Sequence, residues 1–320
     1  MNPYVFIVGC PRSGTTLLQR MIDAHPQIAI TPETHWIPRY FQGRIGVTPD
    51  GVVTAELIDR LLEYERFSKL EIDRATLQTL IGSSPKLLYS SFVSKLFDLY
   101  GQAQGKALVG DKTPAYVEKL PMLHELWPHA KIVHLIRDGR DVCLSLRNWS
   151  RGEKTCGRFS SWAEDPIATV AFWWKRLVQV GQENGAVLGS KLYYELRYES
   201  LVQNPEQECS ALCEFLGLKY HQAMLRFFEG RTRKEPGLNS KDAWLPPTPG
   251  LRDWTKEMPL AEVERFEAAA GDLLAALGYT RLVPVLAGEQ LQHAARIGSS
   301  FTGEIRRRGL PRHWQVPNSV

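Results

Sequence analysis

Five short apolar segments alternate with longer segments of helical spacing along most of this chain. The apolar segments are residues 4–8, 27–30, 106–110, 131–136 and 191–197. Their length and apolar character are typical of strands that are buried on both faces of a parallel sheet. The alternation therefore predicts an α/β fold of the three-layer, P-loop type, in which helices flank a central parallel sheet of about five strands.

Helical spacing fills the segments between these strands. Apolar residues recur at helical intervals from Thr15 onward, and again over 166–183, 205–216, 221–228 and 259–277. Residues 42–105 read as a helical insertion in pieces at 54–67, 73–81 and 85–100, with Asp73 as an N-cap and Pro85 in an early turn. The insertion either covers a binding site or thickens the core. We expect one domain over 1–280, followed by a basic C-terminal tail over 281–320.

The first strand leads into a loop bounded by Gly9 and Gly14, and a helix follows from Thr15. Strand, glycine-bounded loop and helix form an anion cradle, because loop N–H groups and the helix dipole face the same point. The glycine spacing is that of a nucleotide-triphosphatase loop, but Thr15 stands where those enzymes carry lysine. The cation is instead Arg12, within the loop. This pattern predicts oxyanion binding by Arg12 and backbone donors; the alternative is a turn without a ligand.

Three further charged side chains follow strand ends. Glu33 comes after the second strand, Lys112 after the third and Arg137 after the fourth. In an open parallel sheet, ligands bind beyond the carboxyl ends of the strands, so we expect these groups on the same rim as Arg12. Arg137 stands where an Mg²⁺-dependent enzyme of this type ends a strand in Asp, which argues against phosphoryl transfer.

Three motifs resemble the sulfotransferase superfamily that uses 3′-phosphoadenosine-5′-phosphosulfate (PAPS). They are Pro-Arg-Ser-Gly-Thr-Thr at residues 11–16, Asp-Ala-His-Pro at 23–26 and Glu-Thr at 33–34. The wording is closest to the tyrosylprotein sulfotransferases and a related bacterial family. The resemblance is specific over 5–39 and 106–147, and weaker over 192–217 and near Trp254.

This resemblance implies a PAPS site without a metal. The cradle residues Arg12, Ser13, Gly14, Thr15 and Thr16 would bind the donor. Arg137 and Ser145 would hold its 3′-phosphate, Tyr198 would lie near the nucleotide, and Arg252 would add a cation from a loop over 230–253.

The resemblance also implies sulfuryl transfer to a hydroxyl or amine of a small-molecule or peptide acceptor. Glu33 would be the general base, with His35 as its rival, and Arg12 and Lys112 would stabilise the developing charge. The family also has an Arg at the position of Arg39, where it could meet an anionic acceptor. The alternatives are a P-loop kinase or nucleotide triphosphatase, and a nucleotide-binding protein without catalysis.

Composition and charge limit the classes of partner that we expect. Hydrophobic residues make up 43% and charged residues 23% of the chain, as in ordinary globular proteins. The net charge of +4 arises in 281–320, so we expect a solvated basic tail and no nucleic-acid partner. Five cysteines without a C-x-x-C pair, no leader and no spanning segment predict a cytoplasmic protein.

Asp138 and Asp141 are expected to form surface pairs with neighbouring arginines. The sequence leaves the oligomeric state open.

Overall fold

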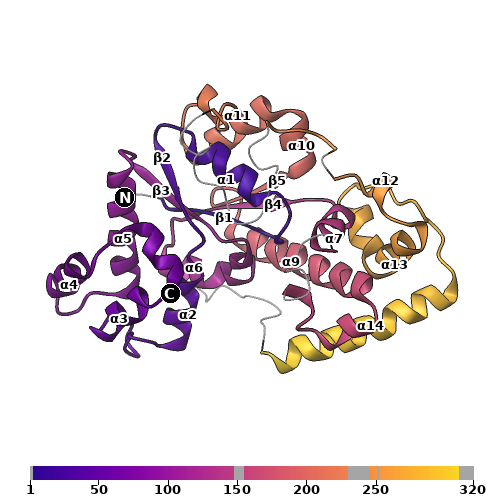
Figure 1. Ribbon diagram of the computed structural model, residues 1–320, viewed down its shortest axis with the longest axis horizontal. Coiled ribbons are helices and arrows are strands. Elements are labelled where there is room, and N and C mark those ends of the chain that lie inside the picture. The colour runs from indigo at the N-terminus through magenta and orange to yellow at the C-terminus, as the bar shows by residue number, and fades with distance from the viewer. Residues whose placement is uncertain (1–2, 148–154, 230–245, 251, 310–320) are drawn as a thin grey trace.

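A five-stranded parallel sheet in the order β2-β3-β1-β4-β5 lies at the centre of the chain (Figure 1). This computed structural model describes residues 3–147, 155–229, 246–250 and 252–309. The strands are β1 (Val5–Gly9), β2 (Ile28–Thr31), β3 (Leu108–Lys112), β4 (Lys131–Ile136) and β5 (Tyr193–Arg197). The predicted α/β fold and its five strands are confirmed. The largest shifts of a strand start are at β3 and β5, which begin two residues later than predicted, because turns occupy 104–106 and 189–192.

Helices cover both faces of the sheet. The helices are α1 (Thr15–Asp23), α2 (Trp36–Gly43), α3 (Glu56–Leu62), α4 (Arg74–Gly82), α5 (Tyr89–Ala103), α6 (Leu120–Leu126), α7 (Gly139–Arg147), α9 (Pro166–Leu188), α10 (Tyr198–Gln203), α11 (Pro205–Leu216), α12 (Trp254–Glu257), α13 (Leu260–Ala276) and α14 (Gly288–Arg307). Short 3₁₀ helices occupy Glu65–Leu70, Pro114–Lys119, Ser160–Ala163 and Gln222–Met224.

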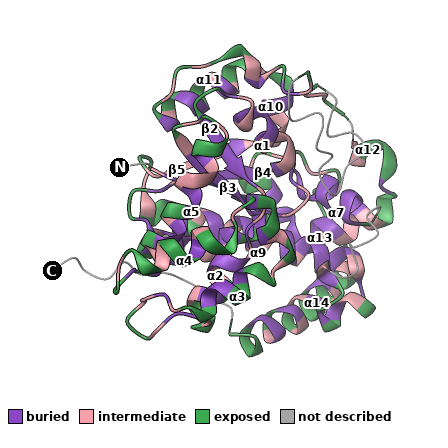
Figure 2. Cartoon of the chain, turned by 60° about the vertical axis from the view of Figure 1, so that its left-hand side comes forward, coloured by how far each residue is buried: buried purple, intermediate pink, exposed green. Residues whose placement is uncertain are grey.

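Successive residues of β1 point into two separate apolar cores, as the pleat of a strand requires. Val5 and Ile7 pack with α1 and α11 on one face. Phe6 and Val8 pack with α5, α6 and α9 on the other. Every residue of β1 and β2 is buried, whereas most of the edge strand β5 is partly exposed (Figure 2). The two-sided burial accounts for the uninterrupted apolar runs in the sequence.

The insertion between β2 and β3 is helical, as predicted, but its pieces differ from those expected. Asp73 does cap α4, since its carboxylate accepts a hydrogen bond of 2.8 Å from the Thr76 N–H. Pro85 is not in the first turn of a helix, because α5 begins only at Tyr89. The residues before Tyr89 are extended: the Val53 N–H donates to the Leu87 carbonyl, and Val52 pairs with Leu88.

The C-terminal region contains a helix that the sequence analysis missed. Helix α14 buries Ile297, Phe301 and Ile305 against α9 and α13, so residues 288–307 are not a solvated tail (Figure 1). The helix predicted over 221–228 is reduced to a single 3₁₀ turn. Residues 310–320 lie outside the described part, and the predicted limits of the domain stay a prediction.

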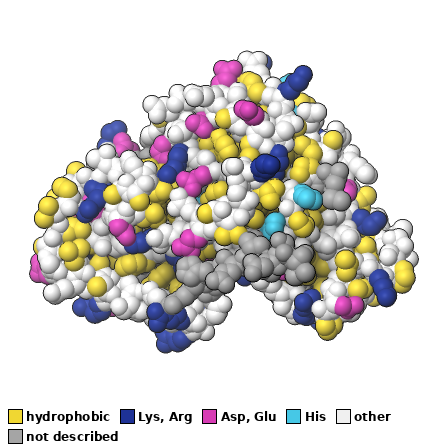
Figure 3. Space-filling model, turned by 180° about the vertical axis from the view of Figure 1, so that it is seen from behind, with side chains coloured by type: hydrophobic (Ala, Val, Ile, Leu, Met, Phe, Trp, Pro, Cys, Tyr) yellow, Lys and Arg dark blue, Asp and Glu magenta, His cyan; other side chains and the backbone are white. Residues whose placement is uncertain are grey.

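Three further observations concern the described residues. Along the part that the structure describes, no helix combines the length and apolarity needed to cross a membrane. All five cysteines are buried and free. Basic and acidic side chains are interspersed over the face shown in Figure 3.

Candidate active site

The loop from β1 to α1 forms a tight cradle because two glycines allow close approaches. A Cβ atom on Gly9 would lie 2.4 Å from the Leu135 carbonyl oxygen, and one on Gly14 would lie 2.4 Å from the Tyr198 ring. Gly14 also has a φ of 93°, in the left-handed region. Arg12 adopts φ 77°, which is uncommon for a residue with a side chain and is found most often at functional sites. The glycine-bounded loop predicted from the sequence is therefore built for close packing.

Three arginines converge on this cradle. Arg12 Nε donates a hydrogen bond of 3.0 Å to Ser145 Oγ on α7. Burial lowers the pKa of Arg12, and the charges of Arg252 and Arg137 lower it further. Like charges this close are unfavourable unless an anion lies between them. The two guanidinium groups expected to hold the ends of the donor thus belong to one cluster, which Arg252 joins.

Arg137 lies almost fully buried at the end of β4. Its guanidinium carbon is 4.3 Å from the centre of the Tyr198 ring, and its Nη2 atom lies 3.4 Å from Asp141 Oδ2. Two buried polar atoms beside this arrangement, Arg137 Nε and Ser13 Oγ, have no hydrogen-bond partner in the described part of the chain. Buried polar groups without partners are rare, so both atoms point to a ligand with acceptor oxygens.

Glu33 lies at the centre of the second half of the site. Its Oε1 accepts a hydrogen bond of 2.7 Å from Lys112 Nζ. Its Oε2 accepts one of 2.6 Å from Arg66 Nη1 and lies 3.0 Å from His35 Nε2. Burial by itself would raise the pKa of Glu33, but the hydrogen bond from His35 and the interactions with Lys112 and Arg66 hold it well below its ordinary value. Glu33 is therefore ionised at neutral pH.

Helix α2 does not stabilise Glu33 through its dipole, because it begins three residues later at Trp36. The turn that carries Glu33 is held from β3 instead. The Thr34 N–H donates 3.0 Å to Thr113 Oγ1 and 3.3 Å to Asp111 Oδ2. Burial raises the pKa of Asp111 to about 6.

Lys112 connects the two halves. Its Nζ lies 3.5 Å from Thr16 Oγ1 in the cradle and forms its shorter contact with Glu33. Thr15 is buried at the start of α1. Arg39 is exposed on α2, and its guanidinium carbon lies 5.9 Å from the ring centres of Tyr40 and Tyr64.

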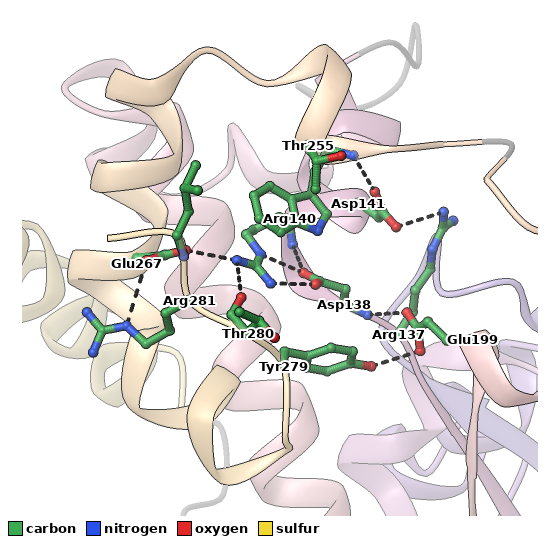
Figure 4. A network of polar contacts seen from close by, with 12 residues as sticks. Arg137, Asp138, Arg140, Asp141, Glu199, Thr255, Glu267, Tyr279, Thr280 and Arg281 are labelled. Carbon is green, nitrogen blue, oxygen red and sulfur yellow. Dashed lines mark hydrogen bonds and ion pairs between the residues drawn. The ribbon is translucent and has the colours of Figure 1, made fainter. Parts of the chain in front are cut away.

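The charged residues that follow Arg137 form a buried network (Figure 4). Arg140 is 1% exposed and bonds both Asp138, at 2.7 Å, and Glu267 of α13, at 2.8 Å. The expectation that Asp138 and Asp141 form surface pairs is therefore wrong, because α12 and α13 cover both residues. The covering elements lie more than a hundred positions away in the sequence.

This network also fixes α12. The Trp254 N–H donates 3.0 Å to Asp141 Oδ1, and the Arg140 guanidinium carbon lies 3.5 Å from the Trp254 ring centre. Arg252, two residues before Trp254, is half-buried. Most of the loop predicted to close over a nucleotide, residues 230–245 and 251, lies outside the described residues.

The structure thus brings the predicted site residues into two adjoining groups. The first group is Arg12, Ser13, Gly14, Arg137, Ser145, Tyr198 and Arg252. The second group is Thr16, Glu33, His35 and Lys112. Sequence reasoning missed Arg66, one of four arginines in the insertion and one without a motif around it. Over the ranges that the structure describes, no three His, Cys, Asp or Glu side chains gather in a way that could hold a metal ion.

Comparisons with known proteins found a matching family and several relatives. The profile of the family described as "Sulfotransferase family" matches residues 3–222. Protein-tyrosine sulfotransferase 1 of Danio rerio is 27% identical over 285 residues, covering 87% of this chain and 72% of that protein. Nodulation protein NoeE of Sinorhizobium fredii is 26% identical over 325 residues, covering 92% of this chain and 68% of NoeE.

Solved structures share the fold. The sulfotransferase domain from the curacin biosynthetic pathway superimposes with a TM-score of 0.56 at 22% identity, over 88% of this chain and 99% of that domain. The sulfotransferase domain of the Synechococcus PCC 7002 olefin synthase gives 0.54 at 21% identity, over 99% of this chain and 96% of that domain.

Proposed function

Since this chain belongs to the sulfotransferase family, we propose that it transfers a sulfuryl group from PAPS to a hydroxyl or amine acceptor, with Glu33 as general base and without a metal. Sulfotransferase activity follows from the family. The observation that carries the choice of donor is the cluster of Arg12, Arg137 and Arg252, together with Ser13 Oγ and Arg137 Nε, two buried atoms without a hydrogen-bond partner among the described residues. Such a cluster fits a ligand with two separated phosphate groups.

The residues divide the binding of such a donor between them. Arg12, the loop N–H groups and the hydroxyls of Ser13, Thr15 and Thr16 would hold the 5′-phosphosulfate at the start of α1. Arg137, with Arg252 and Ser145, would hold the 3′-phosphate, and Tyr198 would keep Arg137 in place through its ring. When bound, PAPS supplies an activated sulfuryl group and a phosphate that leaves.

The remaining residues serve the acceptor. Lys112 and Arg12 place positive charge where negative charge develops, which is typically worth about 2.7–4 kcal/mol per well-aimed donor. Glu33 takes the proton of the acceptor. His35 remains the rival base, since an imidazole is better matched to neutral pH than a carboxylate of low pKa. Its bond to Glu33 favours instead a role in orienting that carboxylate.

The acceptor itself stays open. The relatives named protein-tyrosine sulfotransferases point to a tyrosine hydroxyl. However, His35 replaces the arginine with which those enzymes, by the sequence resemblance, hold an acidic peptide. A small-molecule or a peptide acceptor therefore fits the proposal equally well.

The proposal is tested with labelled PAPS and a pooled metabolite extract, in the presence of a metal chelator. We expect labelled product. In Glu33→Gln the rate should fall about 10²- to 10⁴-fold while the affinity for 3′,5′-ADP is retained. Near wild-type turnover in Glu33→Gln would assign the role of general base to His35. Loss of all turnover on chelation would favour a kinase or triphosphatase, and binding of 3′,5′-ADP without any turnover would indicate a silent nucleotide-binding protein.

A further inference from the structure

The helical insertion contributes a charged group to the site. Arg66 lies on the 3₁₀ helix Glu65–Leu70, between α3 and α4, and its Nη1 atom is 2.6 Å from Glu33 Oε2. This 3₁₀ helix is anchored by Phe67, whose buried ring meets the Trp36 ring edge-on at 5.7 Å. Arg66 is therefore held in place by packing on α2, the helix that follows Glu33.

The contacts of Glu33 are unevenly distributed over its two oxygens. Oε2 is shared by Arg66 and His35, whereas within the described residues Oε1 accepts a hydrogen bond only from Lys112. A carboxylate offers about four lone-pair positions, two on each oxygen. The position that remains for an incoming hydroxyl or amine is therefore on Oε1, beside Lys112.

We propose that Arg66 is a positioning residue that fixes Glu33 Oε2, so that Oε1 is the oxygen presented to the acceptor. This inference rests on the proposed role of Glu33 as the base. It gives the insertion a part in the reaction beyond covering the sheet, because the 3₁₀ helix between α3 and α4 carries this side chain to Glu33. Arg66 acts through Glu33 and is not assigned a contact with the substrate.

The charges around Glu33 allow Arg66 to be tested separately. Lys112 faces the carboxylate from β3, His35 from its own turn and Arg66 from the insertion, while Asp111 lies beside Lys112 at the end of β3. Removing Arg66 leaves Lys112 and His35 in place. One opposite charge close to a carboxyl group shifts its pKa by about 1–3 units.

The experiment is a ¹³C titration of the ligand-free protein labelled at the glutamate side-chain carboxyl, with the Glu33 signal assigned by its loss in Glu33→Gln. In Arg66→Gln the midpoint of the Glu33 signal should rise, because Arg66 donates one of the hydrogen bonds that hold the pKa of Glu33 low. Arg66→Lys keeps the charge and should stay closer to wild type. Arg60→Gln is the matched control, since Arg60 lies on α3 and pairs with Glu56 and Glu63 at the surface.

A Glu33 midpoint in Arg66→Gln equal to that of wild type would overturn the proposal, and so would an equal shift in Arg60→Gln. Arg66→Met, which keeps the apolar stem, provides a second neutral variant should Arg66→Gln fail to fold. Transfer from labelled PAPS into the pooled extract should fall at least about tenfold in Arg66→Gln while 3′,5′-ADP affinity stays within about twofold; unchanged transfer would also overturn it. Failure of the wild-type protein to bind 3′,5′-ADP, by contrast, would refute the proposed donor and leave the titration intact.

Discussion

Replacing Arg137 by alanine should separate the two phosphates of the proposed donor. The side chain is 7% exposed at the end of β4, and its Nε has no partner in the described residues. The guanidinium also contacts Asp141, at 3.4 Å, and the face of the Tyr198 ring. Arg137 therefore has hydrogen-bonding capacity left for a ligand, and alanine removes it while the cradle residues 12–16 keep their own side chains.

The expected size follows from the kind of bond that is lost. A hydrogen bond to a charged group contributes about 1.5–3 kcal/mol, so the affinity for 3′,5′-ADP should fall about 10- to 150-fold. The ligand 5′-AMP lacks the 3′-phosphate. Its affinity should change by less than about threefold, the scale of a remote or screened charge. The ratio of the two losses, rather than either loss alone, reports the 3′-phosphate contact.

Titration calorimetry of both nucleotides against wild type and Arg137→Ala measures this ratio. Arg147→Ala is the control, because Arg147 lies on α7 as well but pairs with Glu262 away from the cradle. Thermal melts should accompany the titrations, since Asp141 loses one of its partners. Equal losses for 3′,5′-ADP and 5′-AMP, in a variant that melts like wild type, would refute the assignment of Arg137 to the 3′-phosphate.

Three other substitutions test the fold around the site. Gly14→Ala places a Cβ against the Tyr198 ring at a φ of 93°, so it should lower the melting temperature and weaken 3′,5′-ADP binding; unchanged melting would contradict the close approach. Burial, aided by neighbouring acids, raises the pKa of Asp141 from 3.8 to about 6, so wild-type stability should fall between those pH values as the buried carboxyl ionises. The free energy of unfolding of wild type should therefore be lower at pH 7 than at pH 4, by up to about 3 kcal/mol, and Asp141→Asn should lose this difference in melts at the two pH values. An Asp141→Asn variant with the same pH profile as wild type would contradict the raised pKa of Asp141. Phe301→Ala should cost about 3–5 kcal/mol in denaturant unfolding, because the ring packs 4.7 Å from that of Phe159; a loss below about 1 kcal/mol would mean that α14 is dispensable.

The sheet and the cradle could be predicted because their signals are local. A strand buried on both faces is apolar throughout, and the turn after β1 needs glycine at positions of close approach. These features are visible in a few consecutive residues, and the family resemblance carried by residues 11–16 is confirmed by the family match over 3–222. Glu33, Lys112 and Arg137 could be placed on one rim because parallel strands all end at the same edge.

The parts that could not be predicted depend on contacts between distant residues. Arg140 resembles any surface arginine in sequence, but it is buried among partners that include Glu267, 127 positions later, and the Trp254 ring. Helix α14 is a different case, because its buried residues Ala294, Ile297, Phe301 and Ile305 do recur at helical spacing. The sequence analysis missed this local signal and gave weight to the basic charge instead. The buried side also holds Glu304, which accepts a hydrogen bond of 2.7 Å from the Ser160 N–H. Arg66 carries no motif at all.

The order of the strands sorts the site into its two halves. On one side of β1 lie β3 and β2, which end in Lys112 and in the turn that carries Glu33. On the other side lie β4 and β5, which lead to Arg137 and Tyr198. The cradle after β1 lies between them, so a donor with its phosphosulfate in the cradle and its 3′-phosphate at β4 would present the sulfuryl group toward the carboxylate. A chain with the same motifs and a different strand order would separate base from donor, and this is why the proposed reaction depends on the topology as much as on the side chains.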